Sequence, residues 1–280
     1  MSLALRGRMP RIALDDTELH YLDTGAASSG ETLLFSHGLL MSHEMFAAQV
    51  EALRERYRCI AYDHRGQGQS APSDLRSIDL GTLTGDATLL IEKLDLGPVH
   101  FVGLSMGGFV GMRLAARRRK LVKSLTLLDT SAGPEPAANV PKYTAMNLTA
   151  RYLGARMLVD RLMPIMFGRS FLADPDKAAV RARWRAHLQA LPRSVWRAVN
   201  GVLERENVTP ELGRIRCPTL ILVGDEDVAT PREQSERIQR GIAGSKLVTI
   251  PRAGHSSTVE EPEAVTTEIS AFLRGLGAGA

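Results

Sequence analysis

The regular alternation of β-prone and helix-prone segments most constrains what this chain can fold into. Continuous apolar runs typical of buried strands occur at residues 32–36, 57–62, 99–102 and 121–129. Between them, apolar side chains recur with helical spacing at about residues 46–53, 80–94 and 108–116. Two earlier strands flank an Asp15-Asp16 turn and predict an antiparallel hairpin at one edge, at residues 11–14 and 17–22. The alternation predicts an α/β fold with a mostly parallel central sheet and helices on both faces.

A long segment without strand signals interrupts this alternation. Residues 131–211 contain only helix-prone stretches separated by prolines, and strands then resume at residues 218–224 and 246–250. We therefore expect a core domain of residues 1–130 and 212–280, with a helical lid inserted at residues 131–211. Ligands of open α/β sheets bind beyond the carboxyl ends of the strands, so such a lid would shape a pocket there and exclude water.

Composition and charge exclude several classes of protein. The 280 residues carry a formal net charge of only +4, and the basic runs at 117–120 and 181–185 lack aromatic or groove-reading partners, so we expect no nucleic-acid ligand. No apolar run approaches the ~18 residues of a membrane span, and residues 1–10 lack the apolar centre of a secretory signal. Cys59 and Cys217 lie beside strand-like residues and are expected to be buried thiols. These features predict a cytoplasmic protein with no membrane partner.

Ser105 stands at the centre of a Gly-Leu-Ser-Met-Gly sequence, residues 103–107, between a predicted strand and a predicted helix. A tight turn in that context lifts the serine clear of the backbone, and small residues two positions to either side avoid collisions. Serine is a weak nucleophile unless a base takes its proton and an acid orients that base. The rest of the chain must therefore supply a base, an acid and donors for an oxyanion.

Two later residues supply the base and the acid. Asp227 and His255 each follow a predicted strand, which gives the chain order Ser, Asp, His expected for this architecture. Asp129, at the end of the strand that follows the helix after Ser105, is the main competitor for the acid, and Asp225 could instead brace its loop. Three further histidines flank loops at the same edge and could line the pocket: His37, His43 and His64.

Two backbone N–H groups complete the predicted site. Met106 begins the helix after the serine, where the helix dipole favours negative charge, and Leu39 follows Gly38 at the end of another strand. Both N–H groups are expected to hold the developing oxyanion. The chain shows no metal-ligand spacing and no phosphate-cradling glycine loop, so we expect neither a metal ion nor an organic cofactor.

Four motifs resemble the α/β-hydrolase superfamily, in the family's order: residues 36–39 (Ser-His-Gly-Leu), 63–70 (Asp-His-Arg-Gly-Gln-Gly-Gln-Ser), 103–108 (Gly-Leu-Ser-Met-Gly-Gly), and 224–231 (Gly-Asp-Glu-Asp-Val-Ala-Thr-Pro) with 254–255 (Gly-His). The resemblance is to the lidded branch that includes 3-oxoadipate enol-lactonases, carboxylesterases, cofactor-free haloperoxidases and carbon–carbon bond hydrolases. It implies that Asp63 and Arg65 brace a structural loop.

Particular residues of this chain narrow the set of activities that the family resemblance implies. Gln67 stands where a histidine is frequent in the family, and Leu39 stands where perhydrolase relatives commonly carry an aromatic residue. The serine at position 105 argues against haloalkane dehalogenases and epoxide hydrolases, which resemble this fold but attack with aspartate.

The function that these residues predict is hydrolysis of a small-molecule carboxylic ester or lactone through an acyl-enzyme on Ser105. Alternatives are carbon–carbon bond hydrolysis, acyl transfer or perhydrolysis with the same triad, and a small-ligand receptor with incidental hydrolysis. The sequence predicts neither the substrate's identity nor the oligomeric state. Five lid side chains could line an apolar pocket, although such residues more often belong to a core: Met146, Met157, Met163, Met166 and Phe167.

Overall fold

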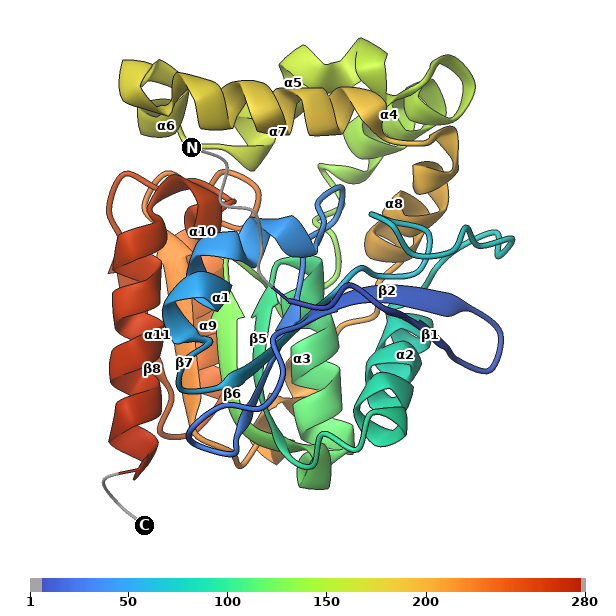
Figure 1. Ribbon diagram of the computed structural model, residues 1–280. Helices are drawn as coiled ribbons and strands as arrows, with labels where there is room; N and C mark the ends of the chain where they lie inside the picture. Colours follow the sequence, from blue (N-terminus) through green and yellow to red (C-terminus); the bar gives the residue numbers. More distant parts are fainter. Residues whose placement is uncertain (1–6, 278–280) are drawn as a thin grey trace.

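An eight-stranded sheet forms the centre of the molecule in the computed structural model, which describes residues 7–277 (Figure 1). The strands lie in the order β1-β2-β4-β3-β5-β6-β7-β8. Their bounds are β1 (Arg11–Ala13), β2 (Glu18–Asp23), β3 (Thr32–Ser36), β4 (Arg58–Tyr62), β5 (Val99–Leu104), β6 (Val122–Leu128), β7 (Thr219–Gly224) and β8 (Lys246–Ile250). All pairings from β4 to β8 are parallel, whereas β1 and β2 form the antiparallel hairpin predicted at one edge.

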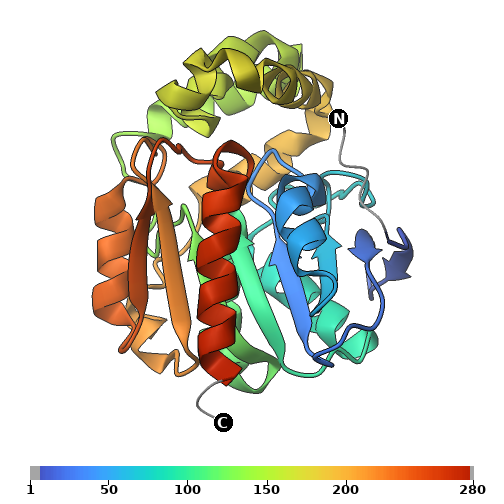
Figure 2. The same ribbon diagram turned by 60° about the vertical axis from the view of Figure 1, so that its left-hand side comes forward.

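Helices cover both faces of this sheet. Within residues 7–277 the α-helices are α1 (Ala47–Leu53), α2 (Leu80–Lys93), α3 (Met106–Arg117), α4 (Val140–Leu153), α5 (Val159–Met166), α6 (Arg169–Ala173), α7 (Ala178–Ala190), α8 (Trp196–Leu203), α9 (Arg232–Gly241), α10 (Ser257–Glu260) and α11 (Pro262–Gly277). Helices α1 and α11 pack on one face, and α2, α3 and α9 pack on the other (Figure 2). The predicted α/β class is therefore confirmed.

Neighbouring residues of a single strand pack in two separate hydrophobic clusters, one on each face of the sheet. In β3, Leu33 and Phe35 pack in one cluster with side chains of α1 and α11, while Leu34 packs in the other with side chains of α2 and α3. All three side chains are fully buried. Because a parallel sheet is covered on both faces, its strands are continuous apolar runs. That pattern explains why the sequence identified these strands.

Helices α4 to α8 lie between β6 and β7 in the sequence, and we call residues 140–203 the helical layer. The layer covers one end of the sheet (Figures 1 and 2). Phe167, Phe171 and Trp184 join it to the core, since all three are buried in the cluster that contains α1 and α11. Residues 131–211 contain helices and turns but no strand, as the sequence pattern predicts.

The structure also bears on the predicted location of the protein and on the predicted burial of its two cysteines. No helix within residues 7–277 is long and apolar enough to cross a membrane. The localisation prediction rests partly on residues 1–6, which lie outside the described residues. Cys59 is buried as predicted, and burial raises the pKa of its thiol to about 12. Cys217 is only half-buried, which corrects the prediction, because it lies in the loop before β7 rather than in the strand.

Candidate active site

Ser105 lies in a strained turn between β5 and α3. Its φ of 52° is in the left-handed region, which costs energy for a residue with a side chain. The two glycines of the motif are required by close packing: a Cβ on Gly107 would overlap the backbone oxygen of Ser36, and a Cβ on Gly103 would overlap the backbone of Gly107. The turn thus presents the Ser105 hydroxyl at the end of the sheet that faces the helical layer.

The structure brings Ser105, His255 and Asp227 into one hydrogen-bonded chain. Nε2 of His255 lies 2.8 Å from Oγ of Ser105, and Nδ1 of His255 lies 3.0 and 3.1 Å from the two carboxylate oxygens of Asp227. A carboxylate only accepts, so Nδ1 carries the proton and Nε2 accepts from the serine hydroxyl. All three residues are buried.

The carboxylate of Asp227 is fixed by its own loop. It accepts hydrogen bonds from the backbone N–H of Ala229 at 2.8 Å, and from the backbone N–H and the hydroxyl of Thr230 at 2.9 and 2.7 Å. Burial alone would raise the pKa of Asp227, but His255 and these hydrogen bonds lower it below its ordinary value. Burial alone would lower the pKa of His255, but Asp227 raises it. Thr230 was missed in the sequence, although it stands in the quoted 224–231 motif.

Asp129, the competing acid, has other partners. Its carboxylate accepts from the backbone N–H of Gly224 at 2.8 Å and from the hydroxyl of Ser257 at 2.5 Å. No hydrogen bond joins it to His255 among the described residues. Burial, followed by the nearby charge of Asp227, raises the pKa of Asp129 to about 7. Asp129 therefore ties the loop after β7 to α10, whereas Asp227 faces the histidine.

The predicted oxyanion donors lie on two backbone segments that meet at Ser105. A Cβ added to Gly38 would come within 3.5 Å of the Ser105 Cβ, so the segment that carries Leu39 passes directly beside the serine. Met106 is the first residue of α3, where backbone N–H groups have no partner within the helix. Gln67 connects the segments, accepting from the Leu40 N–H at 2.9 Å and donating to the Met106 sulfur at 3.7 Å. Sequence reasoning gave Gln67 no role.

The histidines expected near the pocket do not line it. His37 donates from Nδ1 to the Gly38 carbonyl at 2.7 Å and accepts at Nε2 from the His64 N–H at 2.9 Å. Nε2 of His64 in turn lies 3.0 Å from the hydroxyl of Ser36. Burial lowers the pKa of His37 to about 4, so the ring stays neutral. These side chains point into the protein, and their hydrogen bonds hold the loop beneath the site.

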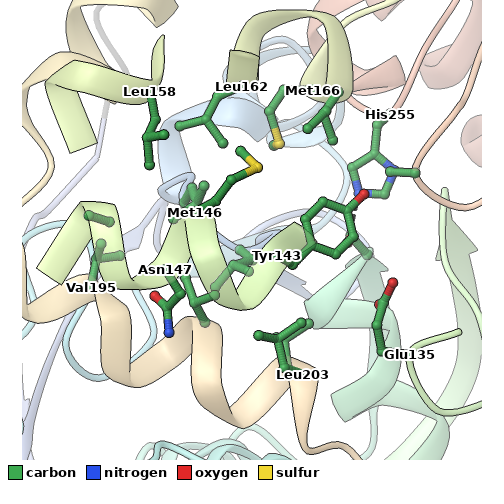
Figure 3. Close-up of a pocket in the computed structure, with 18 of the residues that line it drawn as sticks. Glu135, Tyr143, Met146, Asn147, Leu158, Leu162, Met166, Val195, Leu203 and His255 are labelled. Carbon is green, nitrogen blue, oxygen red and sulfur yellow. Dashed lines mark hydrogen bonds between the residues drawn. The ribbon is translucent and has the colours of Figure 1, made fainter. Parts of the chain in front are cut away.

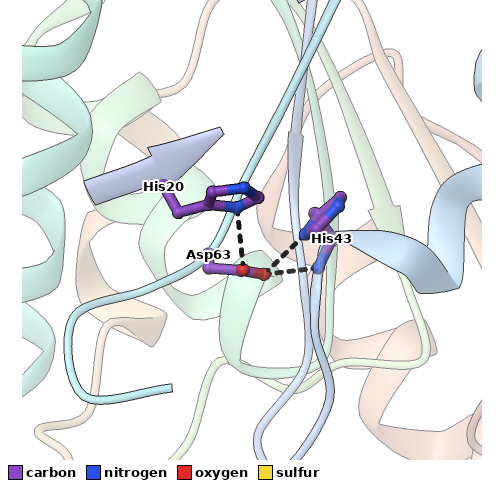
Figure 4. A group of neighbouring side chains, drawn as sticks. All are labelled: His20, His43 and Asp63. Atoms are coloured by element: carbon purple, nitrogen blue, oxygen red, sulfur yellow. Dashed lines mark hydrogen bonds and ion pairs between the residues drawn. The ribbon is translucent and has the colours of Figure 1, made fainter. Parts of the chain in front are cut away.

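His43 belongs to a buried group with His20 and Asp63 (Figure 4). Three ligand-type atoms of this group lie within 4.8 Å of one another, which is close enough to consider a metal ion. The Asp63 carboxylate, however, already accepts from the backbone N–H and Nδ1 of His43 at 2.7 and 2.9 Å, and from the Gln69 N–H at 2.8 Å. A carboxylate held by backbone donors fits a braced loop better than an ion site.

Arg65 braces the same loop from its other side. It forms paired hydrogen bonds to Asp86 at 2.5 and 2.6 Å and to Asp16 at 2.8 and 3.0 Å. The arginine is buried, so these two carboxylates supply the charge that it needs in the interior. Arg65 therefore fixes the position of the loop and does not reach the serine.

A cavity of about 150 Å³ lies between Ser105 and the helical layer (Figure 3). Of the five side chains proposed to line it, Met146 and Met166 do, and they point into it from α4 and α5. The prediction is wrong for the other three side chains. Met157 is 68% exposed, while Met163 and Phe167 are buried in the core cluster that contains α1 and α11. Their helical spacing could not distinguish these three environments.

Two glutamates connect the helical layer to the loops of the site. Glu260 in α10 accepts from the backbone N–H groups of Gly168, Gly254 and Ser256 at 2.7, 2.9 and 2.9 Å. Glu226, next to Asp227 in sequence, accepts from the N–H and hydroxyl of Ser170 at 2.8 and 2.6 Å. The turn between α5 and α6 is therefore joined to both the acid loop and the histidine loop.

Comparison with known proteins agrees with this architecture. Residues 33–268 match the Alpha/beta hydrolase family. A protein named "Putative carbamate hydrolase RutD" from Caulobacter sp. (strain K31) is 28% identical over 262 residues, covering 91% of this chain and 95% of that protein. The structure is similar to a thermophilic esterase from Thermogutta terrifontis, with a TM-score of 0.87, 29% identity, and coverage of 96% of this chain and 99% of that one. It is also similar to the enol-lactonase from Burkholderia xenovorans LB400, with a TM-score of 0.86, 28% identity, and coverage of 95% and 100%.

The family match spans most of the chain, and the sheet order with a serine between β5 and α3 agrees with it. The chain belongs to the alpha/beta hydrolase family, and it is a hydrolase.

Proposed function

We propose that this protein is a serine hydrolase that cleaves small carboxylic esters or lactones through an acyl-enzyme on Ser105. The observation that carries the proposal is the hydrogen-bonded chain from Ser105 through His255 to Asp227, whose serine opens onto an apolar cavity. An oriented base beside the hydroxyl is what a serine needs to act as a nucleophile. The esterase and enol-lactonase that resemble the chain support the same substrate class.

The first half of the proposed reaction forms the acyl-enzyme. The Ser105 oxygen attacks the carbonyl carbon while Nε2 of His255 takes the hydroxyl proton. The oxyanion then accepts hydrogen bonds from the N–H groups of Leu39 and Met106. Collapse of this intermediate breaks the bond to the leaving oxygen, which receives the proton from His255, and the alcohol departs. In a lactone, the leaving oxygen stays attached to the acyl group.

The second half regenerates the enzyme. His255 takes a proton from a water molecule, whose oxygen attacks the acyl carbon of the ester on Ser105. The same two N–H groups hold the second oxyanion, and its collapse returns the proton from His255 to the serine oxygen. The acid leaves the site. Asp227 stays ionised and stabilises the imidazolium ion in both halves.

The helical layer acts as a lid in this proposal. Its residues form most of the cavity lining, so it sets which group fits beside Ser105 and shields the acyl-enzyme from bulk water. The proposal includes a small-molecule substrate, for which a cavity of about 150 Å³ has room, and a cytoplasmic location.

The test is a panel of 4-nitrophenyl esters, simple and enol lactones, and carbamates, measured with the wild type and Ser105→Ala. Wild-type turnover is expected near the enzyme median of ~10 s⁻¹ for the preferred substrate, and Ser105→Ala is expected to lower kcat by roughly 10⁶-fold. Ser235→Ala is the matched control, since Ser235 is buried in α9 and its hydroxyl has no hydrogen-bond partner within the described chain. Ligand-induced stabilisation with kcat far below this median on every substrate would instead favour the receptor alternative.

A further inference from the structure

The cavity above Ser105 is lined mostly by apolar side chains, with a few polar ones such as Asn147 and Thr230. The walls come mainly from the helical layer, with lining side chains that include Met146, Leu158, Leu162, Ile165 and Met166. Apart from His255, the lining residues that can carry charge are Glu135 and Tyr143, which Figure 3 labels, and Arg205. The charge balance of these residues therefore bears on whether the cavity can take a charged substrate group.

Arg205, whose guanidinium is the only one in the cavity lining among residues 7–277, already has an anionic partner. Nη1 of Arg205 donates to the carboxylate of Glu135 at 2.8 Å and to the Val202 carbonyl at 2.9 Å. Its Nε donates to the Gly133 carbonyl at 3.1 Å, and its guanidinium stacks 4.7 Å from the ring centre of Phe109. The Arg205 side chain is buried and that of Glu135 is nearly so, with 4% and 11% exposed. The pair is internally neutral.

A substrate carboxylate in this cavity would lack a compensating charge. It would have to compete with Glu135 for Arg205, at short range and in mostly apolar surroundings that strengthen the repulsion between like charges. Lys142 and Arg161 do not help, because they line a separate groove that shares only Met146 and Ile165 with the cavity. An uncharged group needs no such partner and gains from burial against the apolar wall.

We propose that the hydrolase takes uncharged substrates, in which the group that fills the cavity is apolar and carries up to about six carbons. The size refers to the part of the group that lies inside the cavity, since a volume of about 150 Å³ is enough for a benzene ring. This inference rests on the proposed function and deepens it: the Glu135–Arg205 pair would exclude esters or lactones that place a carboxylate in the cavity.

The test compares kcat/KM for matched ester pairs with the wild-type protein. In the acyl series, 4-nitrophenyl pentanoate is paired with the 4-nitrophenyl half-ester of glutaric acid, which differs only in a terminal carboxylate. In the alcohol series, butyl acetate is paired with 4-acetoxybutanoate. We expect the neutral ester to be favoured by about 100-fold in the series whose varied group fills the cavity. Preference below about tenfold in both series overturns the inference.

Glu135→Gln tests the physical origin of the preference. The substitution keeps the side-chain volume but leaves the Arg205 charge without its anion. The preference for the neutral ester is therefore expected to fall by about tenfold or more. Glu211→Gln is the matched control, because Glu211 pairs with Arg117 outside the cavity and its loss should leave the preference unchanged. An unchanged preference in Glu135→Gln would overturn the role assigned to this pair.

The two proposals fail in different ways. Turnover of neutral and acidic esters at similar rates contradicts only the substrate inference, since the serine chemistry would be intact. Absence of turnover with every ester, lactone and carbamate contradicts the proposed function, and the substrate inference falls with it.

Discussion

Two aspartates at the same edge of the sheet have different tasks because their neighbours differ. Asp227 faces Nδ1 of His255, while Asp129 accepts from Gly224 and Ser257. Sequence reasoning selected Asp227 and kept Asp129 as its main competitor, since chain order shows that two strands end at one edge but not which carboxylate reaches the imidazole. The partners that fix them are mostly backbone N–H groups, which have no signature in the sequence.

This difference predicts unequal effects of two conservative substitutions on catalysis. Asp227→Asn is expected to lower kcat by about 10⁴-fold, because an amide cannot hold the imidazole in the required tautomer or stabilise its charge. Asp129→Asn is expected to lower kcat by less than about tenfold, because an amide oxygen can still accept from Gly224. Steady-state kinetics at one pH compare the two variants. A larger loss in Asp129→Asn would move the acid of the triad to Asp129.

At the scale of elements, α10 connects the helical layer to the histidine loop. Glu260 at its end accepts from Gly168 in the turn before α6 and from Gly254 and Ser256 on either side of His255. Burial raises the pKa of Glu260 to about 7, against the lowering effect of these donors. Sequence reasoning did not select Glu260, because a glutamate beside a helix start looks like a solvated residue until its burial is known.

The raised pKa predicts a pH-dependent stability. The folded protein binds the Glu260 proton more tightly than the unfolded chain, whose glutamates titrate near ~4.3, so the free energy of unfolding should fall as the pH rises from there to about 7. Glu260→Gln removes this contribution and should flatten the dependence in urea unfolding at several pH values. Glu261→Gln, at the neighbouring residue paired with Lys177, is the control and should keep the wild-type slope. An identical slope in Glu260→Gln would refute the prediction.

At the scale of the whole molecule, the sheet and the helical character of residues 131–211 were predictable, but the contacts that the helical layer makes were not. Strands buried on both faces leave continuous apolar runs, so strands at residues 32–36 and 99–102 could be recognised without a structure, and the second of these extends to Leu104 in β5. In the layer, Met146 faces the cavity, Met163 the core and Met157 the solvent. Helical spacing shows which residues share a face but not what that face contacts, so the cavity lining required the structure.

We propose that features at all three scales serve one chemical event, the transfer of an acyl group to Ser105. These features are the strained serine, the loops fixed by buried carboxylates, and the helical layer that lines the cavity. That event leaves a covalent product on the protein, which can be observed directly.

Acid quenching during turnover of 4-nitrophenyl pentanoate, followed by peptide mass spectrometry, tests this claim most directly. The account predicts a pentanoyl ester on the peptide that contains Ser105, and no such adduct in Ser105→Ala. A pentanoyl adduct on a different residue, or turnover that persists in Ser105→Ala, would contradict the account.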